Sequence, residues 1–190
     1  LIFVDLETYQ GLFVSWGDML SNDYSTSYGY SVMGWLHSWF GFEMNKYLVI
    51  LIGVIGFLIP LTRIKMYKNF TFRFLTLVSV LIWVIIFNHK AESPTFIIAM
   101  AGVALWFVTA EKTPFHIVLF ISAFVFTSLS PTDIIPRVVR EEFMKPYMLK
   151  VLPCIIIWGK VIYEMLTLKE DRIGEFFREK LQTRKAPARD

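Results

Sequence analysis

The chain has 190 residues, of which 55% are hydrophobic and 18% are charged. Soluble domains average roughly 45–50% and ~25%, so the composition counts against an ordinary soluble fold. The formal net charge is +3, and the basic residues gather toward the C-terminus. An excess of basic residues in the loops on one side of a membrane explains this positive charge better than nucleic-acid binding does.

The first 45 residues contain acidic side chains but no lysine or arginine before Lys46. We expect this segment to be external. Within it, Ser31 is expected to cap a short helix that ends at Gly41, with Trp35 and Trp39 on one face. Such a helix suits either a lipid headgroup layer or packing against a helix bundle, and the sequence leaves both open.

Apolar runs dominate the rest of the chain, separated by short charged loops. They cover residues 47–62, 70–88, 95–110, 115–130 and 148–168. A helix needs ~17–25 residues to cross the hydrocarbon core, and each run comes close to that length. The sequence therefore predicts an all-α, multi-pass transmembrane helix bundle of about five spans within residues 1–168. A soluble domain with buried helices is the alternative.

The tail, residues 169–190, is predicted to be a cytoplasmic amphipathic helix, because most basic residues outside the runs lie on its side of the bundle. Lys160 and Glu164 are four residues apart and are expected to pair. The histidines lie on different segments, Cys154 is the single cysteine, and no nucleotide-binding or zinc-protease motif is present. We therefore expect no metal and no cofactor.

Two external loops carry the polar residues that are candidates for function. Residues 88–95 combine an amide, an imidazole, a cation and a carboxylate, although a solvated turn with Ser93 or Thr95 as helix cap is the alternative. In residues 130–146, Arg137 and Arg140 are three apart and could hold a phosphate from one helical face. The acidic residues that follow, Glu141 among them, could equally neutralise them.

Four stretches resemble glycosyltransferase family 87: YGYSVMGWL at 28–36, WFG at 39–41, NHKAESP at 88–94 and LSPTD at 129–133. The resemblance implies a GT-C enzyme of the bacterial inner (plasma) membrane, multi-pass, with a cytoplasmic C-terminus. It implies membrane lipid as a partner, together with a polyprenyl-phosphate sugar donor and a lipid or glycan acceptor of the hexose. The catalytic carboxylate of this family is expected upstream of Leu1, so the chain is expected to be the C-terminal part.

The family's chemistry suggests roles for the loop residues. The lipid phosphate is expected to contact four basic residues: Lys90, Arg137, Arg140 and Lys145. The sugar or acceptor is expected to contact three others: Asn88, His89 and Glu92. The predicted function is transfer of a mannose-like hexose on the extracytoplasmic side, and a transporter or permease subunit or a non-catalytic scaffold is the alternative.

Overall fold

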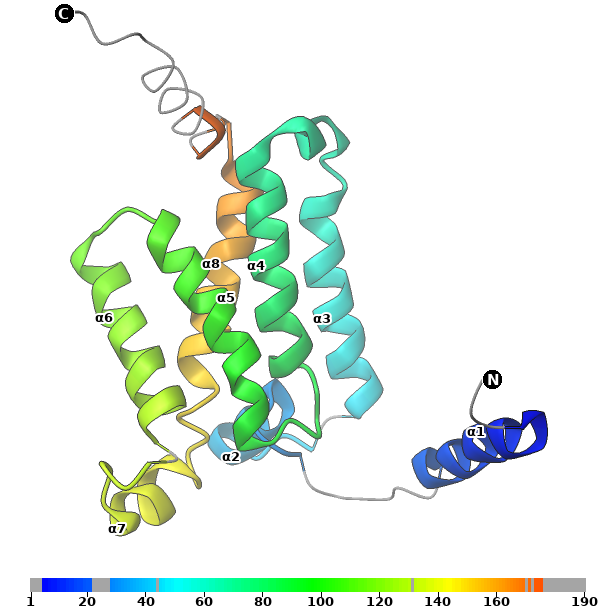
Figure 1. The fold of residues 1–190 in the computed structure, drawn as a ribbon. Helices are drawn as coiled ribbons and strands as arrows, with labels where there is room; N and C mark the ends of the chain where they lie inside the picture. Colours follow the sequence, from blue (N-terminus) through cyan, green and yellow to red (C-terminus); the bar gives the residue numbers. More distant parts are fainter. Residues whose placement is uncertain are drawn as a thin grey trace, which may run out of the picture.

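The computed structural model describes residues 5–21, 28–43, 45–130, 132–169, 171 and 173–175, whose regular secondary structure is helical, with no β-strand among them. The main helices stand side by side (Figure 1): α3 (Lys46–Leu61), α4 (Phe70–Ile86), α5 (Phe96–Thr109), α6 (Pro114–Ala123) and α8 (Leu152–Thr167). Shorter elements join them: α2 (Val32–Phe40), α7 (Arg137–Val139), the 3-10 turns η1 (Ile64–Lys68) and η2 (Ser93–Thr95), and the π-helical turns η3 (Phe124–Leu129) and η4 (Arg140–Met144).

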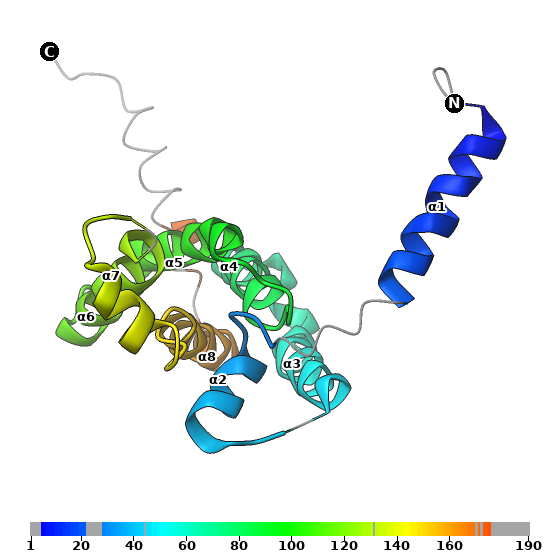
Figure 2. The same ribbon diagram turned by 90° about the horizontal axis from the view of Figure 1, so that it is seen from below.

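Helix α8 is the centre of the bundle and contacts α3, α4, α5 and α6 (Figure 2). Its fully buried residues Cys154, Ile157 and Val161 recur every three or four positions and therefore share one face. Helix α5 presents a matching buried face that includes Phe96 and Trp106. Burial of a large apolar side chain contributes roughly 1.5–3 kcal/mol, so these faces hold the helices together.

Local capping sets where several helices begin and end. The Thr113 side chain accepts a hydrogen bond from the backbone N–H of His116 at the start of α6. At the start of α4, the Asn69 side chain accepts one from the backbone N–H of Phe72. The end of α8 is held differently, by the guanidinium of Arg63, which donates to the carbonyls of Met165 at 2.5 Å and Leu168 at 2.8 Å. One side chain thus satisfies carbonyls that have no partner within their own helix.

The short helix predicted after Ser31 is confirmed as α2. The Ser31 hydroxyl accepts from the backbone N–H of Gly34, and Gly41 ends the helix with a φ of 66°. Helix α2 buries Met33 and Gly34 against the bundle, whereas Trp39 remains 46% exposed. Packing against the bundle, one of the two alternatives, is therefore what the structure has.

Helix α1 (Leu6–Ser21) was not predicted. It stands apart from the bundle in Figure 1, and the side chains of residues 5–19 are exposed. The predicted tail helix, residues 169–190, falls largely outside the described residues, because 170, 172 and 176–190 are not among them.

The predicted multi-pass transmembrane bundle is wrong. Within the described residues, no helix combines the length and the apolar character needed to cross a membrane. Helix α4 has 17 residues, which at ~1.5 Å per residue gives about 25 Å, short of the ~30 Å hydrocarbon core. The predicted multi-pass location in a bacterial inner membrane is wrong for the same reason.

The apolar runs do form helices, but backbone changes inside the runs shorten them. The run at 148–168 begins with turns, so α8 starts only at Leu152. The run at 115–130 changes from α-helix to π-helix at Phe124. Hydropathy counts the apolar residues of a window and does not register where the hydrogen-bond pattern changes.

Candidate functional site

Three stretches that are far apart in the sequence meet at the end of the bundle where α2 and α7 lie (Figures 1 and 2). They are the stretch around α2, the loop before α5 and the turns before α8. The backbone N–H of Tyr30 donates to the carbonyl of Ala91 at 3.2 Å. The indole of Trp39 donates to the carbonyl of Tyr147 at 2.7 Å. These bonds fix α2 against both of the polar loops.

The contact between the α2 stretch and the loop before α5 depends on Gly29. Its φ is 53°, and a Cβ atom placed on it would lie 2.5 Å from the carbonyl oxygen of His89. A larger residue would meet backbone atoms that have no room to yield. Glycine therefore allows the two segments to touch, and the position of His89 is set through its backbone.

A pocket of about 950 Å³, which we call the α2 pocket, opens between the α2 stretch and the turns before α8. Its polar lining comes from six side chains: Tyr28, Tyr30, His37, Ser38, Glu43 and Lys145. Hydroxyl, imidazole, carboxylate and ammonium groups thus border one cavity. This mixture can donate to and accept from a ligand with several hydroxyl groups and can also hold an anion.

Charges are partly paired beside this pocket. Lys145 Nζ lies 2.7 Å from Glu141 Oε2, and Arg140 Nε lies 3.8 Å from Glu141 Oε1. The hydrogen bond from Lys145 is the main reason that the pKa of Glu141 lies below its usual value. Neutralisation by the glutamates, the alternative left open for Arg137 and Arg140, therefore holds for Arg140, and Lys145 is paired with Glu141 as well.

Lys150 is a buried cation between the same segments. It is 3% exposed, and its Nζ donates to Ser93 Oγ at 2.5 Å and to the Ser93 carbonyl at 3.2 Å. The ammonium lies 5.2 Å from the centre of the Phe96 ring and 5.8 Å from that of Tyr30. Burial lowers the pKa of Lys150 from 10.5 to about 8.

The turn that carries Lys150 is unusual in its backbone. Met148, two positions earlier, has a φ of 49°, in the left-handed region that long side chains rarely adopt. The carbonyl of Lys150 accepts a hydrogen bond from Thr127 Oγ1 at 3.4 Å, which joins the turn to the π-helical η3. Lys150 is thus held from several sides.

A second pocket, of about 480 Å³, lies along α5 and η3 and is called the α5 pocket. Its lining is mainly apolar and includes Phe96, Ile97 and Met100, with the hydroxyls of Ser93, Thr127 and Ser128. Lys150 contacts Ser93 and Thr127 of this pocket and the Tyr30 ring of the α2 pocket. One buried lysine therefore touches the walls of a polar and an apolar cavity.

The loop residues predicted to bind the sugar have mixed surroundings. Asn88 Oδ1 accepts from the backbone N–H of Lys90 at 3.0 Å, which stabilises the turn. His89 is partly buried, and burial, with a smaller effect of the Lys46 charge, lowers its pKa. Glu92 is exposed, and its backbone carbonyl accepts a hydrogen bond from the hydroxyl of Thr95, just before α5. These residues lie at the same end of the bundle as the pockets.

The predicted phosphate-binding residues are divided. Lys145 lines the α2 pocket, and the charges of Lys145 and Arg140 act on Tyr30, whose pKa is raised mainly by burial. Arg137 is exposed at the start of α7, and Lys90 is exposed in the loop before α5. The structure thus brings Lys145 to the pocket that Tyr30 also lines.

Sequence reasoning missed Lys150 and Tyr30. A signal for Lys150 was present, since it is a charge inside the apolar run at 148–168, and such residues are often functional. Tyr30 gave no comparable signal, because its importance comes from contacts with residues distant in sequence. Among the described residues, no group of three or more His, Cys, Asp or Glu side chains is arranged to hold a metal ion.

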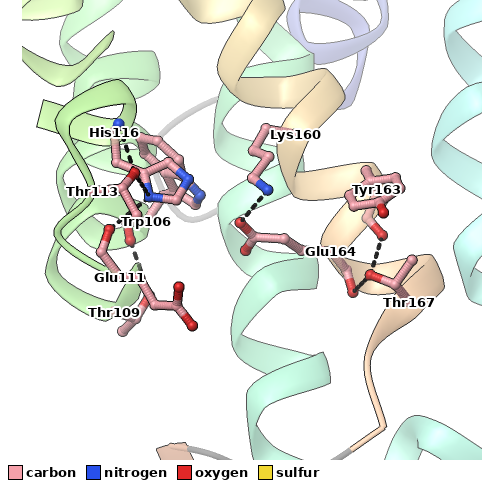
Figure 3. Close-up of polar contacts among 9 residues, drawn as sticks. All are labelled: Trp106, Thr109, Glu111, Thr113, His116, Lys160, Tyr163, Glu164 and Thr167. Carbon is pink, nitrogen blue, oxygen red and sulfur yellow. Dashed lines mark hydrogen bonds and ion pairs between the residues drawn. The ribbon is translucent and has the colours of Figure 1, made fainter. Parts of the chain in front are cut away.

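Another set of polar side chains lies at the opposite end of the bundle (Figure 3). His116 packs edge-on against Trp106, and its Nδ1 lies 2.6 Å from the carbonyl of Glu111. On α8, Lys160 Nζ lies 3.7 Å from Glu164 Oε1, which confirms the predicted pair. Because the α2 pocket, the α5 pocket and the buried Lys150 all lie at the other end, we take that end as the candidate site.

Comparison with protein-family models, curated proteins and solved structures finds no match to this chain. The resemblance to glycosyltransferase family 87 therefore stays a prediction that rests on the four short stretches.

Proposed function

We propose that the chain forms part of an enzyme that transfers a hexose from a polyprenyl-phosphate donor to a lipid or glycan acceptor. The observation that carries the proposal is the buried Lys150, which contacts the walls of a polar and an apolar pocket. A polyprenyl-phosphate sugar has the same order of parts: a polar sugar, an anionic phosphate and an apolar chain. The proposal assigns one region of the site to each part.

The sugar is assigned to the α2 pocket. The hydroxyls of Tyr28 and Tyr30, the imidazole of His37 and the carboxylate of Glu43 border this cavity. Neutral hydroxyls and a carboxylate can bond the hydroxyl groups of a hexose, while aromatic faces pack against its C–H surface. His89, Asn88 and Glu92 are proposed to contact the acceptor beside it.

The phosphate is assigned to the region around Tyr30. Lys145 lines the α2 pocket, Arg140 acts on the same tyrosine, and Lys150 approaches its ring. Binding of an anion here would compete with Glu141 for Lys145 and Arg140 and would stabilise negative charge on the departing phosphate. Lys90 and Arg137 are proposed as weaker outer contacts.

The apolar chain is assigned to the α5 pocket, whose walls include Phe96, Ile97 and Met100. Isoprenoid units would be removed from water there, at roughly 25 cal/mol for each Å² of apolar surface. The hydrogen bond from Lys150 Nζ to Ser93 Oγ, a hydroxyl in the wall of this pocket, puts a cation beside the cavity. Donors with longer chains are therefore expected to bind more tightly until the pocket is filled.

The proposal is tested by measuring binding of three compounds to the purified chain: a polyprenyl-phosphate mannose, the polyprenyl phosphate alone and mannose 1-phosphate. The complete donor should bind most tightly. Lys145→Ala should weaken binding about tenfold or more, because charge-assisted bonds to phosphate are worth ~1.5–3 kcal/mol. The matched control is Lys68→Ala, which removes an exposed lysine from η1 at the other end of the bundle.

Transfer is then measured by mass spectrometry with the same donor and a panel of lipid and glycan acceptors. Equal binding of the donor by wild-type protein and Lys145→Ala would refute the assignment of the pockets. Equal affinity for the three compounds would refute it too, because binding would then depend on neither the sugar nor the polyprenyl group. A hexosyl product that persists in Lys145→Ala would remove this lysine from the phosphate site.

A further inference from the structure

The proposed glycosyl transfer uses Lys150 as a cation, whereas the neutral form of the same amine, beside the hydroxyl of Ser93, allows a second kind of chemistry. Ser93 Oγ lies 2.5 Å from Lys150 Nζ, although the two residues are 57 positions apart. An activated serine needs a base within hydrogen-bond reach of its hydroxyl, and a lysine can be that base when it is neutral. The geometry of such a pair is present here.

The surroundings of Lys150 favour the neutral amine. The side chain is 3% exposed, and burial lowers its pKa to about 8. Among the described residues, the titratable groups that face it are Tyr30 and Cys154. Burial raises the pKa of Tyr30 and raises that of Cys154 to about 12, so neither group is charged at pH 8. The amine is then the group of this cluster that loses its proton near pH 8.

Ser93 is accessible to a substrate, whereas Lys150 is not. Ser93 is partly exposed and lines the α5 pocket of about 480 Å³. Phe96, Ile97 and Met100 form apolar walls of the same cavity. A base shielded from water beside a nucleophile that opens into an apolar cavity is the arrangement that an acyl-transfer site needs.

We propose that Ser93 is a nucleophile and Lys150 its general base in a site that accepts an ester or thioester with an apolar acyl chain. The neutral amine takes the Ser93 proton while Oγ forms a bond to the carbonyl carbon. The Lys150 ammonium then faces the tetrahedral oxyanion. Collapse of this intermediate breaks the bond to the leaving alcohol or thiol, which receives the proton from Lys150.

The resulting acyl-serine is released by a second attack. Lys150, neutral again, takes a proton from water as the water oxygen bonds to the acyl carbon. The bond to Ser93 Oγ breaks, Oγ regains a proton from the ammonium, and a carboxylic acid leaves. The activity needs water as its only co-reactant and goes beyond glycosyl transfer, since it does not depend on the α2 pocket.

The test treats the purified chain with an alkyl fluorophosphonate and maps the modified residue by peptide mass spectrometry. The adduct should form on Ser93, at a rate that rises with pH to a plateau with a midpoint near 8. Lys150→Arg keeps a positive charge but supplies no base at this pH, so labelling should slow by ~100-fold or more. Ser15→Ala is the control, because it removes the hydroxyl of an exposed serine on α1, outside both pockets, and it should react like wild type.

A second readout uses p-nitrophenyl esters with acyl chains of increasing length, whose hydrolysis should follow the same pH profile and favour longer chains. Circular dichroism checks that each variant is folded. Ser93→Ala should lose both the labelling and the hydrolysis. If this variant does not fold, Ser93→Cys replaces it, and its thiol should be alkylated faster than the buried Cys154, whose pKa is raised.

Labelling of Ser128 instead of Ser93 would overturn the proposal. So would an unchanged rate in Lys150→Arg or a rate independent of pH. Binding of polyprenyl-phosphate mannose is measured in parallel, with Lys145→Ala as its sensitive variant. If the donor binds but Ser93 is not labelled, the acyl-transfer proposal has failed. If Ser93 is labelled but the donor does not bind, the proposed glycosyl transfer has failed.

Discussion

Replacing Lys150 with methionine should change the way in which stability depends on pH. Burial lowers the pKa of Lys150 from 10.5 to about 8, so the unfolded chain holds this proton more tightly than the folded chain does. The buried ammonium therefore destabilises the folded state. This destabilisation is complete below pH 8 and decreases as the pH rises toward 10.5. One pKa unit corresponds to about 1.4 kcal/mol, which gives a full effect of about 3 kcal/mol.

About 2 kcal/mol of this effect falls between pH 7.5 and 9.5. Lys150→Met keeps the length of the side chain and removes the charge. The free energy of unfolding of the variant minus that of wild type should therefore decrease by about 2 kcal/mol across this range. The raised pKa of Cys154 also makes stability depend on pH, but it acts on both proteins and cancels in the difference.

The assay is denaturant unfolding at pH 7.5, 8.5 and 9.5, followed by tryptophan fluorescence. Lys68→Met makes the same chemical change at an exposed position, where the ammonium keeps its water on folding, and should give a much smaller variation. A difference between Lys150→Met and wild type that does not vary with pH would refute the reasoning, because it would mean that the charge is not buried at a cost.

Three further predictions concern the fold. Arg63→Ala should lower the free energy of unfolding by about 1–3 kcal/mol, measured by denaturant titration, because two carbonyls at the end of α8 lose their donor. Gly53→Ala should lower the free energy of unfolding by about 1–3 kcal/mol in the same assay, because the new Cβ would lie 2.5 Å from the ring of Phe87, which follows α4. Gly159→Ala is its control, with no atom within 4 Å, and should be neutral or stabilising. Burial raises the pKa of Asp171, but hydrogen bonds from Thr71 outweigh it and hold the pKa below 3.8. The stabilisation from ionised Asp171 is present above pH 3.8 and is lost as the pH falls through the pKa of the folded state. In Asp171→Asn the free energy of unfolding should therefore fall less steeply at acidic pH.

Features set by neighbouring residues could be predicted from the sequence. The cap at Ser31 and the end at Gly41 depend on a few adjacent residues, and both are confirmed. The pair of Lys160 and Glu164 follows from helical spacing alone. The apolar runs marked the main helices, but their lengths depend on turns and π-helical segments, so the predicted spans failed.

The candidate site could be predicted only in part. Lys145 was chosen from its loop and does line the α2 pocket. Lys150 owes its surroundings to Ser93, 57 positions away, and to the ring of Tyr30. The apolar run around Lys150 marked this charge as unusual, but the groups that it contacts are a property of the assembled bundle.

The docking of α2 through hydrogen bonds from Ser38 and Trp39 to carbonyls 108 positions away has a consequence for folding. Long loops must close before either cavity exists, so this end of the molecule should be among the last parts to form. A compound that binds in the cavities of the folded chain would hold these segments together and raise the melting temperature, by an amount that grows with the logarithm of its affinity. A thermal-shift screen could thus find natural ligands before any reaction is known.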